Sequence, residues 1–269
     1  MAVEGRVRTE DHGRVRVLTF DRPGRANAFD AALYRAAAAG LTGADLDDGV
    51  GAVVLTGAGR TFTAGTDLAE MADTADAGPG PVDRTTPGAA GDRPEHPFDA
   101  FLDAVVGFGK PLLAAVNGAG VGLGLTLLAH CDLVLVSENA RLKAPFTQMG
   151  VVPEAASSYL LPRRMGDQRA AEALLTSGWI SAEDAVASGL ALRKYAPDDL
   201  LPEAVALAQA IAAHPAGSVR ATKALLTASR RDAVSEARRR EGAAFADILR
   251  SPAMGNAIRN HLAGEKGAS

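Results

Sequence analysis

Three short runs of almost purely apolar residues constrain the fold more strongly than any other feature of this sequence. They are GVGAVVLT, PLLAAVN and DLVLV, at residues 49–56, 111–117 and 132–136. Such runs are typical of strands that are buried on both faces, as in parallel sheets. A further strand-like run covers 14–20, and helical patterns cover 29–40, 98–108 and 121–130. Strands and helices mixed at this spacing predict an α/β fold.

The last third of the chain has a different pattern, because from residue 167 onward it is almost wholly helical. One clear stripe of apolar residues at helical spacing is formed by Leu201, Val205, Ala208 and Ile211. We therefore predict two parts, a core of residues 1–200 and a helical C-terminal region of residues 201–269. The C-terminal region would serve either as a packing appendage or as an oligomer contact.

The segment at 73–97, DTADAGPGPVDRTTPGAAGDRPEHP, is long, polar and rich in proline and glycine. A loop of this length without secondary structure is usually functional or disordered. Two interpretations are open for this segment, a surface insertion or a flap over a ligand site.

Composition excludes several classes of protein. The net charge is −4 and the isoelectric point is about 5.8, so the chain lacks the overall positive charge that is typical of nucleic-acid-binding proteins. The single cysteine, Cys131, cannot form an internal disulfide, and a reducing cytoplasm fits best. Residues 1–15 lack the apolar stretch of a secretory signal, and no apolar run approaches the length of a membrane span. We expect a cytoplasmic protein without membrane or nucleic-acid partners.

Two glycine-rich turns each follow a predicted strand and open a predicted helix. They are NGAGVGLGLTLLAHCD at 117–132 and FTAGTDLAEM at 62–71. The first lacks the G-x-G-x-x-G spacing of a dinucleotide site and the Gly-Lys-Ser/Thr of a P-loop. It is either a tight strand–helix corner without a ligand or a place where backbone N–H groups point at one. Two such turns could supply one amide each to an oxyanion.

The usual devices for nucleophilic catalysis and metal binding are missing from the sequence. It has no G-x-S-x-G elbow, and its five histidines lack the helical pairing with glutamate that marks a metal site. We expect Cys131 in the core, His130 at a helix end, and Ser157 and Ser158 as helix caps. This leaves Glu154, in GVVPEAASSY, as a carboxylate among small and apolar residues. Such a group is either exposed at a loop tip or held in a pocket.

The segment KPLLAAVNGAGVGLGLTLLAHCDLVLVSENARLKAPFTQMGVVPEAASSYLLPRRMG resembles the crotonase (enoyl-CoA hydratase/isomerase) superfamily. DRPGRANAF at 21–29 and GAGRTFTAGTDLAEM at 57–71 resemble two further motifs of that family, in the same order. The resemblance implies a spiral of ββα units with a helical C-terminal trimerisation region, and hence a homotrimer or a dimer of trimers. It also implies an acyl-CoA thioester of fatty acid metabolism as substrate. Coenzyme A is then part of the substrate, and no further cofactor is expected.

In this family two backbone amides polarise the thioester carbonyl, and by position they are the N–H groups of Thr66 and Leu123. Family members often have alanine and glycine there, but threonine and leucine still supply the backbone donors. The resemblance assigns coenzyme A contacts to the first loop and to a basic residue before it: Arg25, Ala64, Thr66, Asp67 and Leu68. For Arg25, an exposed loop arginine without a ligand is an equal alternative.

Hydratases of this family activate water with two glutamates, and this chain has neither of them. Thr126 and Phe146 stand at those positions, and neither side chain exchanges protons near neutral pH. Together with Val151 they are expected to line the acyl pocket. Glu154 stands where isomerases of the peroxisomal type, which convert 3-enoyl-CoA to 2-enoyl-CoA, have a glutamate. The likeness to those isomerases extends to VG-x-x-x-TLL, PF and PE-x-x-SSY.

We therefore expect an enoyl-CoA isomerase in which Glu154 is the single acid and base beside a two-amide oxyanion hole. An apolar setting would raise the pKa of the carboxyl group and make it a better base. Two alternatives stay open. One is another crotonase reaction, such as hydration or C–C cleavage, and the other is a catalytically silent acyl-CoA-binding protein.

Overall fold

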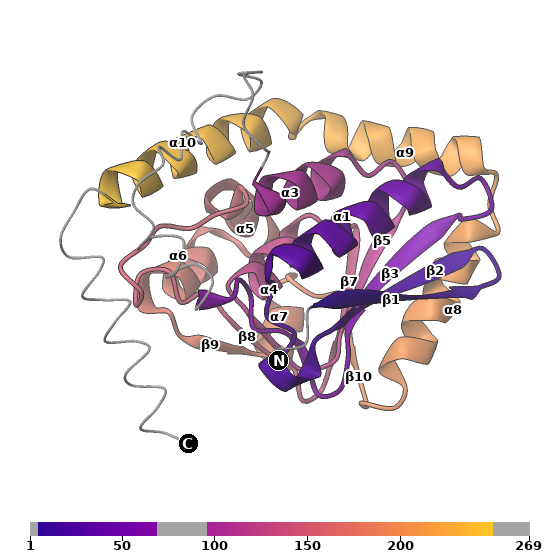
Figure 1. The fold of residues 1–269 in the computed structure, drawn as a ribbon, viewed down its shortest axis with the longest axis horizontal. Helices are drawn as coiled ribbons and strands as arrows, with labels where there is room; N and C mark the ends of the chain where they lie inside the picture. Colours follow the sequence, from indigo (N-terminus) through magenta and orange to yellow (C-terminus); the bar gives the residue numbers. More distant parts are fainter. Residues whose placement is uncertain (1–4, 69–95, 250–269) are drawn as a thin grey trace.

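A computed structural model of the chain describes residues 5–68 and 96–249 (Figure 1). Six strands form the larger sheet, in the order β1-β2-β3-β5-β7-β10. They span Arg6–His12, Val15–Asp21, Ala52–Gly57, Leu112–Val116, Leu133–Ser137 and Arg193–Tyr195. The smaller sheet has the order β4-β6-β8-β9, with strands Thr61–Thr63, Ala119–Val121, Arg141–Lys143 and Trp179–Ser181. The predicted α/β fold class is confirmed.

The four strands predicted from apolar runs are β2, β3, β5 and β7, which lie side by side and pair in parallel. β3 and β5 are buried along their whole length, which explains why their sequences do not alternate. β1 was not predicted, because RVRTEDH is polar and largely exposed. It is an antiparallel edge strand, where charged side chains protect the free edge from pairing with other chains.

From β3 to β8, successive strands alternate between the two sheets. β3 is followed by β4, β5 by β6 and β7 by β8, and the first of each pair lies in the larger sheet. Helical turns follow the last two pairs: α4 (Leu123–Thr126) and η2 (Leu127–Ala129) after β6, and α5 (Ser157–Met165) after β8. This is the predicted ββα repeat. Because β4 and β6 pair in parallel, the loops that leave their carboxyl ends lie next to each other.

Helices cover both faces of the larger sheet (Figure 1). On one face α1 (Ala31–Leu46) and α3 (Pro97–Gly107) bury Leu33, Leu41 and Phe101 in the main core. Asp30 caps α1 by accepting the Leu33 N–H at 2.7 Å. On the other face α8 (Leu200–Ala212) buries the stripe formed by Leu200, Ala204 and Ala208. Although α8 begins the predicted C-terminal region, it closes the core.

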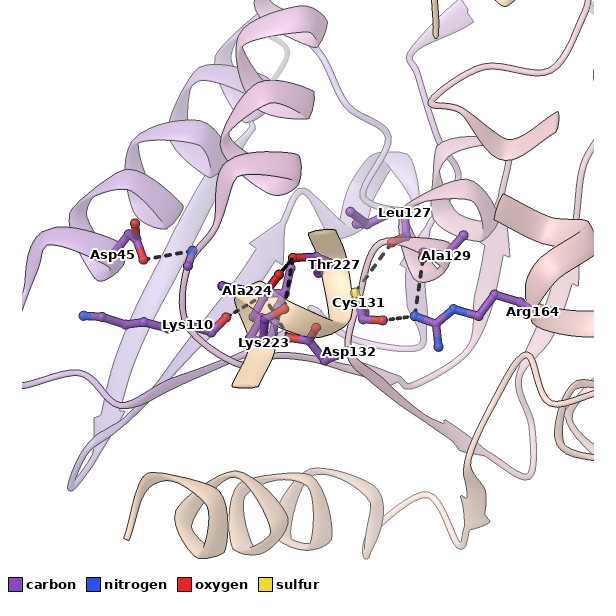
Figure 2. Close-up of polar contacts among 12 residues, drawn as sticks. Asp45, Lys110, Leu127, Ala129, Cys131, Asp132, Arg164, Lys223, Ala224 and Thr227 are labelled. Atoms are coloured by element: carbon purple, nitrogen blue, oxygen red, sulfur yellow. Dashed lines mark hydrogen bonds and ion pairs between the residues drawn. The ribbon is translucent and has the colours of Figure 1, made fainter. Parts of the chain in front are cut away.

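The last two described helices, α9 (Ala216–Ala228) and α10 (Arg231–Leu249), run beside α1 and α3 (Figure 1). α9 buries none of its side chains, and Leu225 and Leu226 are 77% and 72% exposed. Lys223 attaches α9 to the sheet: its ammonium group donates to the Lys110 carbonyl at 2.6 Å and pairs with Asp132 at 2.8 Å (Figure 2). A second cation of α9, Arg220, pairs with Asp45 of α1 at 3.5 Å. Lys223 and Arg220 thus fix α9 to the body, while its apolar outer face is unpaired among the described residues.

Two further helices, α6 (Asp167–Thr176) and α7 (Ala182–Ala187), follow α5, and a 3-10 turn, η1 (Pro23–Arg25), follows β2. The predicted helix at 121–130 is two short pieces, α4 and η2, and it begins only at Leu123, because β6 extends to Val121 and Gly122 forms the turn between them. Nearly all of the segment at 73–97 lies outside the described residues, as does the end of the C-terminal region. Within the described ranges, none of the helices combines the length and the hydrophobicity that crossing a bilayer requires.

Candidate active site

The first predicted oxyanion donor is the Thr66 amide. Its orientation is set by an isolated β-bridge between Thr66 and Phe29, in the loop before α1. In this parallel bridge the Phe29 N–H donates to the Gly65 carbonyl at 2.7 Å, and the Asp67 N–H donates to the Phe29 carbonyl at 2.9 Å. Because peptide groups alternate in direction along extended backbone, the Thr66 N–H points away from Phe29. No acceptor for it occurs among the residues that the structure describes. It is therefore available to a ligand.

The second predicted donor, the Leu123 amide, is the first N–H group of α4. Gly122 precedes it with φ 55° and ψ −113°, a conformation that side-chain-bearing residues rarely adopt. The N–H groups of Leu125 and Thr126 both donate to the Gly122 carbonyl, so these two donors are satisfied inside the turn. The Leu123 N–H belongs to the helix-start donors that lack an intrahelical acceptor, and no described residue accepts it.

Gly65 brings the two amides together. A Cβ atom added to Gly65 would lie 2.6 Å from the Val121 carbonyl oxygen and 3.3 Å from the Leu123 nitrogen. Its φ of +85° is also in the left-handed region that favours glycine. The backbone at Gly65 therefore lies directly against the Leu123 amide, and the Thr66 amide follows one peptide unit later. The two amides are therefore neighbours, as the predicted oxyanion hole requires.

A buried polar network that the sequence analysis did not identify holds the first loop in place. Asn27 accepts the Arg22 N–H and donates to the Ala58 and Thr61 carbonyls, the latter at 2.7 Å. The Arg22 guanidinium pairs with Asp67 at 2.6 Å and with Asp30 at 3.1 Å. These residues lie in the DRPGRANAF stretch and in the first loop. The available signal was the presence of Arg22 and Asn27 in the DRPGRANAF motif, but their contacts with the residues around the first loop are visible only in three dimensions.

The side chain of Thr66 is also held, since its hydroxyl forms a hydrogen bond of 2.7 Å with the Tyr34 hydroxyl on α1. Tyr34 itself is 3% exposed and packs against Phe29 with ring centroids 4.9 Å apart. The contact orients the threonine where the family often has alanine. Tyr34 was predicted only as part of a helix, because its contact with Thr66 spans 32 residues.

The predicted coenzyme A contacts lie in one region but differ in accessibility. Arg25 is exposed at the end of η1. This exposure agrees both with a contact to coenzyme A and with a loop arginine that binds no ligand. Ala64 and Leu68 are half-buried, and the Ala64 N–H donates to the Ala26 carbonyl at 2.9 Å. Asp67 donates its N–H to Phe29 and pairs through its carboxylate with Arg22, so these contacts join the first loop to the DRPGRANAF segment. The first loop continues into residues 69–95, which the structure does not describe.

Glu154, the predicted acid and base, is half-buried in an irregular segment directly before α5. The two residues after it, Ala155 and Ala156, are buried and have φ values of 58° and 57°. Residues with a Cβ atom rarely adopt this left-handed conformation, which costs about 1–3 kcal/mol per residue and clusters at functional sites. The backbone next to Glu154 is therefore strained and must be held by its surroundings.

His130 is one of the groups that hold this segment. Its Nε2 atom lies 2.7 Å from the Ala155 carbonyl oxygen. Burial lowers the pKa of His130 to about 4, so the ring is neutral near pH 7. A carbonyl oxygen can only accept, and Nε2 must therefore carry the proton. His130 lies at the end of η2, as predicted, and it links the Glu154 segment to the helical turn that begins at Leu123.

Glu241 on α10 is the second group. Its carboxylate accepts the N–H groups of Ala156 at 2.7 Å and Ser158 at 2.9 Å, and the Ser158 hydroxyl at 2.6 Å. The prediction that the side chains of Ser157 and Ser158 cap a helix is wrong. Ala156 occupies the cap position, and the acceptor that satisfies the helix start is Glu241. A serine cap can be identified from the local sequence, whereas this acceptor comes from 83 residues away.

Arg164 on α5 adds a second link between this region and the turn that begins at Leu123. Its guanidinium donates to the Ala129 carbonyl at 3.3 Å and to the Cys131 carbonyl, at the end of η2 (Figure 2). Cys131 is fully buried, as predicted, and burial raises the pKa of its thiol to about 12. It is therefore a core residue without thiolate character near neutral pH.

The three residues predicted to line the acyl pocket are close in the chain to these segments. Thr126 is fully buried in α4, with its hydroxyl near the Leu123 carbonyl at 3.5 Å. Phe146 is 7% exposed, and its carbonyl accepts the Val151 N–H at 2.9 Å. Val151 is half-buried against the main core. Neither Thr126 nor Phe146 can act as a proton donor or acceptor in catalysis, so Glu154 is the one predicted acid and base.

Comparisons with known proteins agree with this geometry. The family model described as enoyl-CoA hydratase/isomerase matches residues 10–258. A probable enoyl-CoA hydratase of Rhizobium meliloti (strain 1021) is 37% identical over 203 residues, which are 76% of this chain and 74% of that protein. Enoyl-CoA delta isomerase 2 of Rattus norvegicus is 34% identical over 214 residues, which are 80% of this chain and 52% of the rat protein.

A solved structure shows the same fold over almost the whole chain. The crystal structure of an enoyl-CoA hydratase/isomerase from Pseudoalteromonas atlantica T6c aligns with a TM-score of 0.86 and 34% identity, over 96% of this chain and 97% of that one. Together with the match of the family model over most of the sequence, this similarity extends to the strands, the glycine turns and the helices around Glu154. The chain belongs to the enoyl-CoA hydratase/isomerase (crotonase) family of enzymes.

Proposed function

We propose that this enzyme isomerises 3-enoyl-CoA to 2-trans-enoyl-CoA, with Glu154 as the single acid and base. One observation carries the proposal. Glu154 is held beside the turn that provides the Leu123 amide, while Thr126 and Phe146 occupy the positions where hydratases have carboxylates. Among the predicted site residues that the structure describes, the site therefore offers one proton carrier and two amide donors, which is what an allylic shift requires.

The chemistry balances with these groups alone. The Glu154 carboxylate takes a proton from C2 of the acyl chain, and the electron pair of the C2–H bond moves toward the thioester carbonyl. The charge of the resulting dienolate rests on the thioester oxygen, where the N–H groups of Thr66 and Leu123 stabilise it. The carboxyl group then returns the proton at C4, and the double bond forms between C2 and C3. Coenzyme A is part of the substrate, and no metal or further cofactor takes part in these steps.

A second reaction of the family is the main alternative. The relative from Rhizobium meliloti is named a probable enoyl-CoA hydratase and the rat relative an isomerase, so the names of relatives do not distinguish the two reactions. Hydration, or a C–C cleavage, would need a further proton carrier in place of Thr126 or Phe146. A catalytically silent acyl-CoA-binding protein would not need Glu154 at all.

We propose that the assembly is a homotrimer or a dimer of trimers, with the C-terminal helices at the contacts. The exposed face of α9, with Leu225 and Leu226 at 77% and 72% exposure, supports this proposal, because isolated apolar helix faces are usually covered by a partner. A cytoplasmic location and a role in fatty acid metabolism are part of the same proposal.

The reaction is tested with purified enzyme and two substrates of equal chain length. We expect isomerisation of 3-enoyl-CoA to exceed hydration of 2-enoyl-CoA by roughly 10²-fold or more, since a missing acid or base group is worth 10²–10⁴ in rate. Both rates are measured by separating the products chromatographically. A hydration rate equal to or above the isomerisation rate would assign the chain to the alternative reaction.

A further inference from the structure

One buried carboxylate, Glu241, has no part in the proposed chemistry and yet contacts the segment that carries the base. Glu241 is 8% exposed and follows Val234 and Ala237 on the buried stripe of α10. Burying a carboxylate is unfavourable unless hydrogen bonds replace its hydration. The partners of Glu241 therefore indicate what this residue does in the folded protein.

The partners all belong to the first residues of α5. Oε2 accepts the Ala156 N–H at 2.7 Å, and Oε1 accepts the Ser158 N–H at 2.9 Å and the Ser158 hydroxyl at 2.6 Å. Hydrogen bonds to an ionised carboxylate are stronger than those between neutral groups. Both oxygens are engaged, so the carboxylate has a defined orientation against the backbone.

These bonds act on the strained part of the backbone. Ala155 and Ala156 are both buried in the left-handed conformation, which persists only where the surroundings enforce it. His130 holds the Ala155 carbonyl and Glu241 holds the Ala156 N–H. The peptide group between Ala155 and Ala156 is thus held at its carbonyl and at its N–H by residues from two different helical elements.

We infer that Glu241 is a positioning residue, whose bonds to Ala156 and Ser158 fix the direction in which the Glu154 side chain leaves the backbone. This inference rests on the proposed role of Glu154 as the base. Glu241 stands 85 residues beyond Ala156, on the last described helix. The packing of α10 against α5 therefore belongs to the construction of the active site, in addition to any role in assembly.

The test is the substitution Glu241→Gln in the full-length enzyme. Glutamine has nearly the same volume, but its NH₂ group cannot accept a bond from an N–H or O–H donor. We expect kcat for 3-enoyl-CoA to fall by roughly 10- to 100-fold with KM unchanged, because small displacements of a reacting group have effects of this size. Hydrogen exchange measured by mass spectrometry should accelerate in a peptide covering residues 150–160.

The matched control is Arg238→Gln on the same helix. Arg238 pairs with Asp103 of α3 at 2.6 Å and does not contact the Glu154 segment. This variant should retain the wild-type kcat and the wild-type exchange of the 150–160 peptide. An equal loss of kcat in both variants would mean that α10 acts through general stability, and would overturn the positioning role.

Comparison with Glu154→Gln separates this inference from the proposed function. If Glu154→Gln is inactive and Glu241→Gln has the wild-type kcat, the positioning role is wrong and the proposed function stands. If Glu154→Gln is active, the proposed function fails, and with it the role assigned to Glu241.

If Glu241→Gln does not fold, the substitution Ser158→Ala tests the positioning role in its place. It removes the hydrogen bond of the Ser158 hydroxyl, which is one of the three bonds to Glu241. We expect a loss in kcat of roughly 3- to 10-fold for one lost bond, and an unchanged kcat would overturn the inference.

Discussion

Replacing Glu154 by glutamine should lower kcat for isomerisation of 3-enoyl-CoA by about 10³- to 10⁴-fold, the upper range for loss of an acid or base group. The reason is that Thr126 and Phe146 offer no substitute proton carrier at the two positions where hydratases have one. Glutamine keeps the length of the side chain, so the irregular segment before α5 should retain its conformation. The measurement is steady-state kinetics together with binding of coenzyme A by calorimetry.

Three properties should be unchanged in this variant: the melting temperature, the secondary structure and the affinity for coenzyme A. The matched control is Glu203→Gln, which alters an exposed carboxylate on α8 at the opposite face of the sheet. It should retain full activity. Substantial turnover by Glu154→Gln would contradict the one-base mechanism, because the proton would then have to be carried by a different side chain or by water.

The second large effect is expected for Gly65→Ala, which should lower kcat by roughly 10²- to 10³-fold, the loss measured for one oxyanion-hole donor. The added methyl group would lie 2.6 Å from the Val121 carbonyl oxygen and 3.3 Å from the Leu123 nitrogen. Backbone atoms cannot rotate out of the way as a side chain can. The loops after β4 and β6 must therefore separate, and the Thr66 and Leu123 amides no longer converge on one oxygen.

Gly13→Ala separates this effect from ordinary backbone strain. Gly13 has a φ of +64°, close to the +85° of Gly65, but an added Cβ atom there meets nothing within 4 Å. Gly13→Ala should lose about 1–2 kcal/mol of unfolding free energy from the left-handed conformation, measured by urea denaturation. Gly65→Ala should lose more, because the clash with the Val121 carbonyl adds to the same strain. Only Gly65→Ala should lose kcat. Full activity in Gly65→Ala would show that the two amides do not act together.

Much of the fold could be predicted because its central strands are buried on both faces. The apolar runs of β3, β5 and β7 have few alternative structures, and the glycine turns after them are local signals. β1 was missed because an exposed edge strand carries no apolar alternation. The three-residue strands of the smaller sheet are too short to show a period. Their pairing depends on the parallel arrangement of the larger sheet.

The residues of the candidate site could be proposed from motifs, whereas most of the contacts that hold them could not be predicted. Thr66, Leu123 and Glu154 could be assigned from motifs, since each lies in a conspicuous local stretch. The residues that hold them could not. Glu241 lies in ARRREGAAF, where a run of charges indicates a solvated helix face, and the contact that buries it spans 85 residues.

The sequence also gives no indication that two alanines adopt a left-handed backbone conformation. Ala155 and Ala156 have no side-chain feature that favours a positive φ, unlike the glycines at 65 and 122. Their conformation is imposed by His130 and Glu241, which come from segments far apart in the chain. Tertiary contacts of this kind override local preference, so the geometry next to Glu154 could be described only from the structure.

The most direct test of the central claim is a crystal structure of the enzyme with a 2-enoyl-CoA product or a non-reactive analogue. We predict that the thioester oxygen lies about 2.7–3.1 Å from the nitrogens of both Thr66 and Leu123. A Glu154 carboxylate oxygen should lie within about 3.5 Å of both C2 and C4, the reach that proton transfer at both carbons requires. A thioester oxygen bound elsewhere, or a carboxylate that reaches neither carbon, would contradict the account.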